Sequence, residues 1–194
     1  MNKLVFATNN QHKLSEVQAM VGKLFTISSL ADMDIIEDIP ETADTFEGNA
    51  SQKSAYILHH YQLDCFADDS GLEVEALQNE PGVFSARYSG TRNMEANIDL
   101  LLSRLGNNMN RNARFRTVIS LRIDGEHHLF EGTINGIITD ERIGIEGFGY
   151  DPIFIPNGYD KTFAEMAPEE KNSISHRAIA TAKLVSFLKD RNNI

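Results

Sequence analysis

The chain of 194 residues is 41% hydrophobic and 24% charged, an ordinary globular composition with enough apolar residues for a sizeable core. Its net charge of −10 argues against a long nucleic-acid polymer or an anionic membrane as partner, because both require a basic surface. One cysteine, Cys65, cannot build a disulfide framework, which favours a cytoplasmic protein. The sequence contains no apolar segment typical of a secretion signal or of a membrane span.

The N-terminal segment predicts a strand, a helix and a second strand. Residues 3–8 and 24–30 are apolar enough for strands. Residues 10–21 between them carry Leu14, Val17 and Val21 at helical spacing, with Asn10 as a candidate N-cap.

The next segment predicts a helix and then a strand that turns. Asp44 and Glu47 resemble a capping box, which places a helix over residues 46–61. Residues 65–74, CFADDSGLEV, begin as a buried strand. The Asp-Ser-Gly sequence inside them favours a turn, after which the chain runs out again as a second strand.

The second half predicts a helix, a hairpin, a short strand and a last helix. Residues 94–105 read as a helix, and residues 114–134 alternate apolar and polar side chains around an Asp-Gly turn. A glycine-rich loop over 144–159 contains a short strand, and a helix begins near 173–175. The order β-α-β-α-β-β-α-β-β-β-α indicates a mixed α/β protein around a long sheet.

The segment ATNNQHK, residues 7–13, is a candidate phosphate site. It joins the end of a strand to the start of a helix, where unpaired N–H groups and the helix dipole favour an anion. Lys13 lies one turn into the helix and could reach back to the same anion. The alternative is a plain N-cap with a solvated lysine.

Asp68 and Asp69 are candidates for a metal site or for proton transfer. Successive side chains of a strand point to opposite faces, so the two carboxylates face the same way only if the strand has ended. One could ligate a metal while the other orients a neighbouring element, and Mg²⁺ prefers carboxylates together with water and phosphate. The alternative is ordinary turn chemistry.

Further candidates are polar side chains with plain structural alternatives. Asn49 and Lys53 share one face of the predicted helix 46–61, which could also be a solvated face. Glu41 follows a proline that keeps the backbone extended. Arg87 lies in the loop GVFSARYSG and could clamp a phosphate or be a surface arginine.

The last candidates lie near the C-terminus. Phe148 is flanked by two glycines, which frees the backbone to approach a ligand, and aromatic rings stack on nucleobases. The alternative is an aromatic ring that fills the core. His176 and Arg177 lie at the start of the last helix and oppose its dipole, which is either a small mismatch or the mark of a nearby anion.

Taken in order, the segments resemble those of the inosine triphosphate pyrophosphatase family, in its bacterial type. These enzymes are also called non-canonical purine nucleoside triphosphate pyrophosphatases or XTP/dITP diphosphatases. The resemblance is carried by TNNQHK, PETADTFEGNASQK, ADDSGLEV, GVFSARYSG, GFGYDPIF and KNSISHR and extends from residue 4 to about residue 188. The sequence departs from the family pattern at Asn9 and at His12, where glycine is common.

The resemblance implies one domain over residues 1–194, built as a mixed elongated central sheet flanked by helices, with two lobes and an active-site cleft between them. It also implies Mg²⁺-dependent hydrolysis of ITP, dITP and XTP to the monophosphate and pyrophosphate, which removes deaminated purines from the nucleotide pool. The expected partner is the nucleoside triphosphate, with no nucleic-acid polymer and no membrane, and the expected assembly is a cytoplasmic homodimer.

The resemblance further implies the roles of individual residues. Asp69 would be the catalytic base and, with Glu41, a metal ligand, although Asp68 could take the proton while Asp69 ligates. Residues 8–13, Lys53, Arg87 and Lys171 would hold the phosphates, and Phe148 would stack on the purine. The complete set of expected substrate contacts is Thr8, Asn9, Asn10, Gln11, His12, Lys13, Lys53, Ser70, Arg87, Phe148, Gly149, Tyr150, Asp151, Lys171, His176 and Arg177.

Two other functions remain open from the residues. One is a different metal-dependent hydrolase, such as a pyrimidine nucleoside triphosphate pyrophosphatase. The other is a nucleotide-binding module without catalysis, against which the intact carboxylates and lysines argue.

Overall fold

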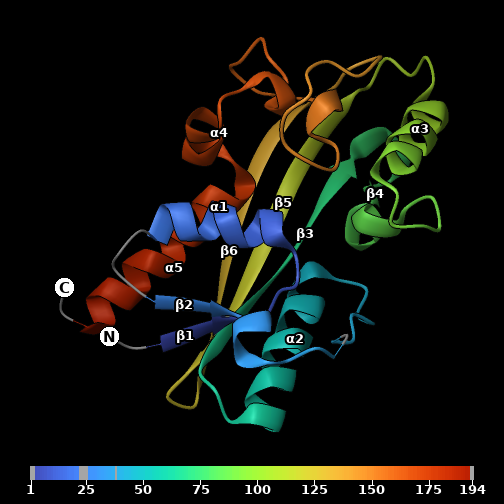
Figure 1. The fold of residues 1–194 in the computed structure, drawn as a ribbon. Helices are drawn as coiled ribbons and strands as arrows, with labels where there is room; N and C mark the ends of the chain where they lie inside the picture. The colour runs from blue at the N-terminus through green and yellow to red at the C-terminus, as the bar shows by residue number, and fades with distance from the viewer. Residues whose placement is uncertain (1–2, 22–25, 38, 193–194) are drawn as a thin grey trace. The chain divides into compact units, whose positions relative to one another are not determined.

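The protein folds as a mixed α/β structure, seen in a computed structural model that describes residues 3–21, 26–37 and 39–192 (Figure 1). In the described part of the chain, seven strands form one sheet in the order β2-β1-β3-β5-β6-β7, and β4 pairs with β3. The pairs β1–β2 and β1–β3 are parallel, whereas β3–β4 and β6–β7 are antiparallel. The predicted mixed sheet flanked by helices is therefore confirmed.

The strands and helices follow the predicted order except in three places: the two strands predicted within residues 65–74 are the single strand β3, and strand β4 and helix α4 were not predicted. The strands are β1 (Lys3–Phe6), β2 (Thr26–Ser29), β3 (Cys65–Val74), β4 (Glu80–Pro81), β5 (Asn112–Ile123), β6 (Glu126–Ile138) and β7 (Phe154–Pro156). The helices are α1 (Gln11–Val21), α2 (Phe46–Tyr61), α3 (Met94–Leu105), α4 (Pro168–Ile174) and α5 (His176–Asn192). Helix α4, which begins at a proline, was not predicted.

The chain divides into two compact units. The first contains residues 1–69, 117–132 and 177–194, and the second contains residues 70–116 and 133–176. Each is described by itself below. The predicted single domain and the cleft between lobes stay predictions.

In the first unit, helices cover both faces of the sheet. Phe6 and Phe66 stack on each other, with ring centroids 4.4 Å apart, and belong to the core that α1 and α5 cover. Their neighbours Val5, Cys65 and Ala67 point the other way, into a core with α2. Cys65 is buried, and burial raises the pKa of its thiol to about 12, so it packs as a small hydrophobic side chain.

In the second unit, the sheet has one apolar and one polar face. Leu72 and Val74 of β3 and Phe115 of β5 belong to a core that α3 covers. The residues that alternate with these along the strands lie on the other face, where Glu73 and Arg114 form an ion pair. The alternation of apolar and polar residues is what a strand buried on one side requires.

Several predicted elements are confirmed at residue level. Helix α3 has the predicted bounds, and Asn10 caps α1 by accepting hydrogen bonds from the main chain of its first turn. The β5–β6 hairpin turns at Asp124 and Gly125, both with positive φ (48° and 81°), as a two-residue turn of this sequence type requires.

The turn predicted inside residues 65–74 is wrong. Strand β3 runs unbroken through Asp68, Asp69 and Ser70. The reason is tertiary: Phe66 before the Asp-Ser-Gly sequence and Leu72 after it are both fully buried in strand positions, and burial of this extent outweighs a local turn preference.

The predicted capping box of α2 is also wrong, by one residue. The N-cap is Thr45, whose side chain accepts a hydrogen bond from the Gly48 amide, so Asp44 lies outside the helix. Gly48 is required because a Cβ there would lie 2.5 Å from the Cβ of Ala43. The glycine lets residues 41–45 pack against the first turn of α2.

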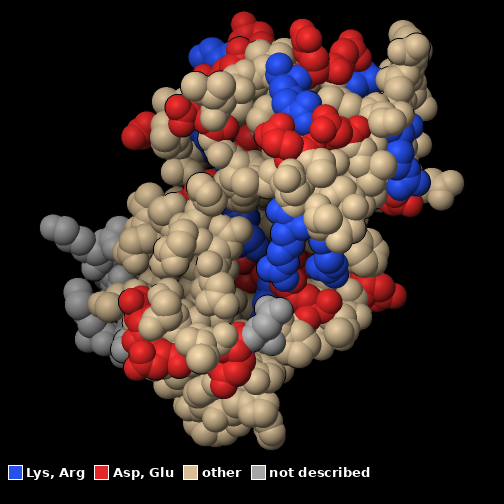
Figure 2. All heavy atoms as spheres, turned by 45° about the vertical axis from the view of Figure 1, so that its right-hand side comes forward, with Lys and Arg blue, Asp and Glu red and all other residues tan. Residues whose placement is uncertain are grey.

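Acidic side chains outnumber basic ones, 28 to 18, in line with the net charge of −10. On the face shown in Figure 2, red Asp and Glu side chains appear at several separate places and blue Lys and Arg side chains form small groups. None of the described helices is long and apolar enough to cross a membrane.

The position of the α2 cap can be tested by stability. We expect Thr45→Ala to lower the free energy of unfolding by about 1 kcal/mol, because the Gly48 amide loses its acceptor. The matched change Asp44→Ala should stay within about 0.5 kcal/mol of the native protein, as exposed substitutions do. Urea unfolding followed by circular dichroism measures both. A larger loss for Asp44→Ala would contradict this assignment.

Candidate active site

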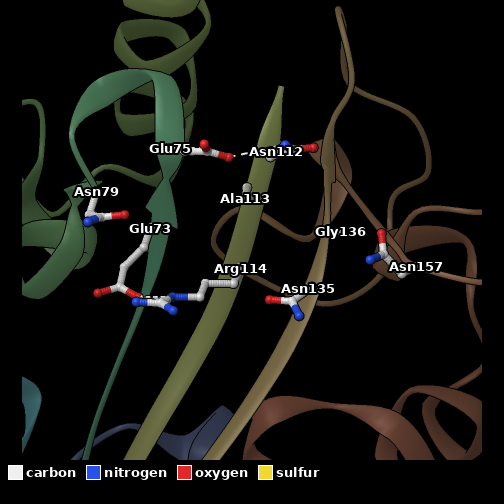
Figure 3. A pocket seen from close by; sticks show the side chains of 9 residues that line it. All are labelled: Glu73, Glu75, Asn79, Asn112, Ala113, Arg114, Asn135, Gly136 and Asn157. Carbon is white, nitrogen blue, oxygen red and sulfur yellow. Dashed lines mark hydrogen bonds and ion pairs between the residues drawn. The ribbon is translucent and has the colours of Figure 1, made fainter. Parts of the chain in front are cut away.

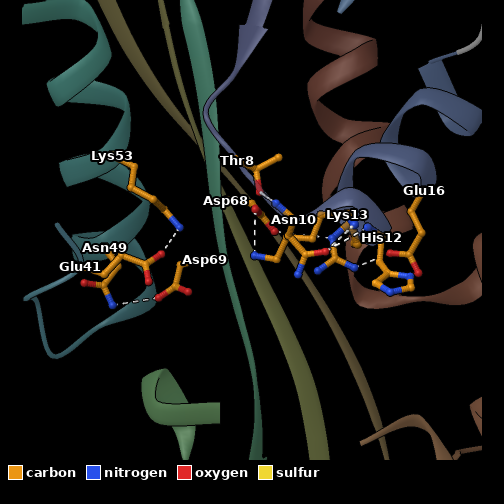
Figure 4. Close-up of polar contacts among 11 residues, drawn as sticks. Thr8, Asn10, His12, Lys13, Glu16, Glu41, Asn49, Lys53, Asp68 and Asp69 are labelled. Carbon is orange, nitrogen blue, oxygen red and sulfur yellow. Dashed lines mark hydrogen bonds and ion pairs between the residues drawn. The ribbon is translucent and has the colours of Figure 1, made fainter. Parts of the chain in front are cut away.

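The centre of the site is the pair Asp68 and Asp69 in the middle of β3. Because the strand continues through them, the two side chains leave it on opposite faces (Figure 4). Asp68 follows Phe66 by two residues, so its side chain lies on the same face of the strand, toward α1 and α5. Asp69 follows Ala67 by two residues and points to the α2 side.

Asp68 is a buried counter-ion with two cationic partners. It is 1% exposed, and its carboxylate lies 3.0 Å from Nζ of Lys13 and 3.5 Å from Nε of Arg177. Burial alone would raise the pKa of Asp68, but Lys13 and Arg177 outweigh it and hold the pKa well below its usual range. The pKa of Lys13 is lowered by burial, which Asp68 offsets only in part.

Arg177 also forms an ion pair with Glu16 of α1. The arginine is 2% exposed and lies at the start of α5, where a cation opposes the helix dipole. Two carboxylates, Asp68 and Glu16, compensate for that position. The unfavourable position of this cation at the start of α5 is therefore offset by two ion pairs within the protein.

Asp69 lies in a different electrostatic environment. Its carboxylate accepts a hydrogen bond from Nδ2 of Asn49 at 2.9 Å. Burial raises the pKa of Asp69 and outweighs the opposing effects of Lys53, Lys13 and the Asn49 amide. The two neighbouring aspartates thus have pKa values shifted in opposite directions.

Lys53 and Glu41 form an ion pair beside this aspartate. Burial alone would lower the pKa of Lys53, but the carboxylates of Glu41, Asp68 and Asp69 outweigh it and raise the pKa. Asn49 and Lys53 are both buried on one face of α2, as their spacing predicts. The alternative of a solvated helix face is wrong for these two residues.

The predicted phosphate segment caps its own helix. The Asn10 side chain accepts hydrogen bonds from the amides of His12 (3.0 Å) and Lys13 (3.2 Å), and the Asn10 amide donates to the Thr8 hydroxyl. Asn9, Gln11 and His12 are exposed. Lys13 reaches back from the first turn as predicted, and its partner is Asp68.

Glu41 and Asp69 suit a hard divalent cation. Both carboxylates raise the pKa of Lys53, so their combined charge stabilises a cation next to them. Mg²⁺ is usually held by one or two carboxylates together with water and phosphate oxygens. In the parts of the chain that the structure describes, no group of three or more His, Cys, Asp or Glu residues could hold a metal. Two carboxylates are therefore the protein ligands that this site could offer a cation.

In the second unit, Asp151 organises the predicted base-binding loop. Its Oδ2 accepts hydrogen bonds from the amide of Phe148 (2.7 Å) and from Nζ of Lys171 (2.8 Å). Lys171 also lies 4.9 Å from the centroid of the Phe148 ring. Gly147 has φ of 78°, and a Cβ there would lie 2.2 Å from the Asp151 carboxylate, so only glycine fits.

The other predicted residues of this unit have defined surroundings. The hydroxyl of Tyr150 donates to the carbonyl of Ser85, and the His176 ring stacks on Phe115 at 4.7 Å between centroids. Ser70 follows Asp69 in β3. Arg87 ends the 3-10 helix η3, Gly82–Arg87, with its guanidinium 5.3 Å from the centre of the Phe84 ring.

Two roles were not predicted from the sequence. Asn49 was singled out only for sharing a helix face with Lys53, and Glu16 was not considered. The spacing of four residues on α2 could have suggested that Asn49 supports Asp69. No local pattern connects Glu16 to Arg177, which follows 161 residues later.

A separate polar hollow of about 510 Å³ lies on the second unit (Figure 3). The ion pair of Arg114 with Glu73 and the hydrogen bond of Asn112 to Glu75 cross it between neighbouring strands. It contains none of the predicted site residues. Its lining is Glu73, Glu75, Asn79, Asn112, Ala113, Arg114, Asn135, Gly136 and Asn157.

Comparison with known proteins gives one consistent family. The model of the Ham1 family matches residues 4–187. The chain is 52% identical over 187 residues to a dITP/XTP pyrophosphatase of Flavobacterium johnsoniae, covering 96% of this chain and 97% of that protein. It is 53% identical over 190 residues to a dITP/XTP pyrophosphatase of Porphyromonas gingivalis, covering 97% and 98%. The solved structure of the Staphylococcus aureus Ham1 protein matches with a TM-score of 0.90 at 42% identity, covering 98% of this chain and all of that one.

The opposite environments of the two aspartates predict opposite effects on stability. We expect Asp68→Asn to lower the free energy of unfolding at pH 7 by about 3 kcal/mol, because it leaves Lys13 without its carboxylate partner and Arg177 with Glu16 alone. Asp69→Asn should leave stability unchanged or raise it, since it removes a buried charge and keeps an oxygen for Asn49.

The two aspartates should also make the folding stability depend on pH in opposite directions. The depressed pKa of Asp68 gives stability that is present at neutral pH and lost as the pH falls through that pKa. The raised pKa of Asp69 gives stability only at low pH, lost as the pH rises. Urea unfolding of the native protein and both variants at pH 3, pH 5 and pH 7 measures this, because the contribution of Asp68 changes only at acidic pH. Equal losses for the two substitutions would contradict the assignment.

Proposed function

The chain belongs to the Ham1 family, and we propose that it hydrolyses the deaminated purine nucleoside triphosphates dITP, XTP and ITP to the monophosphate and pyrophosphate. It is a nucleoside triphosphate pyrophosphatase, as its relatives are named. The observation that carries the proposal is the pair of adjacent buried aspartates with oppositely shifted pKa values, each next to a lysine.

Asp69 is the base that we assign to the attacking water. It raises the pKa of the neighbouring Lys53, and its carboxylate is oriented by the hydrogen bond from the Asn49 amide. Asp68 is unsuited to that role because Lys13 and Arg177 depress its pKa, which makes its carboxylate a weak proton acceptor. Its function is to place Lys13 and Arg177. Water activated at Asp69 would attack the α-phosphorus, and pyrophosphate would leave.

The charges around the pair leave room for a cation. Three cations, Lys13, Lys53 and Arg177, face four carboxylates: Glu16, Glu41, Asp68 and Asp69. Glu41 and Asp69 are the residues that would hold Mg²⁺. When bound, Mg²⁺ would neutralise phosphate charge and polarise the centre under attack. Lys13 and Lys53 would turn from these carboxylates to phosphate oxygens when substrate binds, with Arg87 and Lys171 as the further basic contacts.

The base would lie against Phe148. The ring is fixed by the contacts of its amide to Asp151 and of its face to Lys171, and Gly149, Tyr150, His176 and Arg177 would complete the pocket. Hypoxanthine and xanthine carry a 6-oxo group, adenine carries an amine there, and guanine adds a 2-amino group. A pocket with donors for the 6-oxo group and no acceptor for a 2-amine would reject both normal purines, because buried polar groups would be left unpaired.

We further propose a cytoplasmic homodimer that acts on free nucleotides. The single buried cysteine and the acidic charge support this setting. The biological role would be the removal of deaminated purines before a polymerase can use them.

The substrate range is tested by product analysis. Purified protein with Mg²⁺ is incubated separately with ITP, dITP, XTP, ATP, GTP and dUTP, and the products are separated by ion exchange. We expect monophosphate and pyrophosphate from the first three and little from the others, with turnover lost in EDTA and restored by Mg²⁺. Preferred use of dUTP would favour the pyrimidine alternative, and binding without turnover would favour the non-catalytic module.

The role of Asp69 is tested by its replacement with asparagine. We expect Asp69→Asn to lower kcat on dITP by about 100-fold or more, the usual contribution of a positioned base. Asn49→Ala should give a smaller loss, because Asp69 keeps its charge but loses its orienting donor. Circular dichroism controls for folding. Unchanged kcat in folded Asp69→Asn would reassign the base.

A further inference from the structure

Asn97 of α3 binds the main chain on both sides of Arg87. Its Oδ1 accepts hydrogen bonds from the amide of Ser89 at 2.7 Å and from the hydroxyl of Ser89 at 2.8 Å. Its Nδ2 donates to the carbonyl of Ala86 at 3.2 Å. One side chain therefore joins the residue before Arg87 to the second residue after it.

This amide is held rigidly. Asn97 is 3% exposed, and the next residue, Ile98, belongs to the apolar core of the second unit. The start of α3 is fixed by Asn93, whose side chain caps the helix at the Ala96 amide. A buried asparagine with three hydrogen bonds has little freedom to shift, because each bond that it loses would leave a polar group unpaired.

Arg87 itself is fixed through its backbone, while its partly exposed side chain lies over a neighbouring ring. Its carbonyl accepts a hydrogen bond from the Gly90 amide at 2.9 Å, which closes the turn after η3. Its guanidinium lies over the ring of Phe84, a residue that is 54% exposed. The position of the charge thus depends on the backbone that Asn97 holds.

We propose that Asn97 is a positioning residue that fixes Arg87 for its contact with the substrate phosphates. This rests on the proposed function, in which Arg87 supplies positive charge to the triphosphate. Apolar packing of α3 alone would be served by a leucine at this buried position. The amide instead satisfies two donors and one acceptor of the Arg87 loop.

The same helix has a second attachment to this loop with a different character. Arg104 pairs with Glu80 and donates to the hydroxyl of Tyr88 at 2.7 Å. Its side chain is 46% exposed, so this attachment is weaker than the buried one. Because Arg104 still ties the loop to β4 in an Asn97 variant, the contribution of Asn97 can be measured without detaching the whole segment.

A double-mutant cycle tests the proposal. The kcat and KM for dITP are measured for native protein, Arg87→Ala, Asn97→Ala and the double variant. We expect each single change to lower kcat/KM by about tenfold, mainly through KM, and the double variant to lose less than about threefold more than either. A helix-cap control, Asn93→Ala, weakens α3 but leaves the Arg87 loop bonded. In that background, Arg87→Ala should keep its full tenfold effect.

Several results would overturn the inference. Additive losses from Arg87 and Asn97 would show that Asn97 acts only on stability, and an unchanged kcat/KM in Arg87→Ala would remove Arg87 from the site. Native protein that cleaves none of the three purine substrates would refute the proposed function and the inference with it. If Asn97→Ala does not fold, Ser89→Ala removes one of the three bonds and should give a smaller loss of kcat/KM that is again non-additive with Arg87→Ala.

Discussion

The site depends on the extended backbone of β3 at Asp68 and Asp69. Because successive strand residues point to opposite faces, two adjacent identical side chains enter two different layers. One meets Lys13 and Arg177 from α1 and α5, and the other meets Asn49 from α2. The strand thereby gives chemically identical groups different pKa values without any change in sequence between them. A turn at this point would have put both carboxylates in one environment.

The acidic charge of the chain is compatible with an anionic substrate because the cations are concentrated. Lys53 is buried and Lys13 is half-buried, each next to a carboxylate, and a buried charge without a partner is costly. Glu41 and Asp68 therefore keep the lysines charged and in place while no phosphate is present. In the proposed function, phosphate oxygens would replace these carboxylates as the partners of the two lysines.

The sequence predicted elements whose signals are local. The helix 94–105 and the Asp-Gly hairpin at 124–125 were correct, because spacing and turn chemistry decide them. The turn within 65–74 was wrong because burial on both sides overrides turn preference. The cap of α2 was misplaced because Asp44 and Thr45 are both good N-caps, and packing against Gly48 decides between them. The ion pair of Glu16 with Arg177 had no local signal at all.

The two units hold their functional side chains in place by different kinds of contact. Around β3, ion pairs and a buried amide fix the carboxylates, and these contacts can be exchanged when a charged substrate enters. In the base loop, the Asp151 carboxylate fixes a main-chain amide and a lysine, and Gly147 is the only residue that leaves room for it. Recognition of a base by its oxo group needs donors that stay in place, since misplaced donors would accept either purine type. A charge network that can rearrange suits the binding of a charged ligand, whereas a loop held by main-chain hydrogen bonds suits recognition by fixed donors.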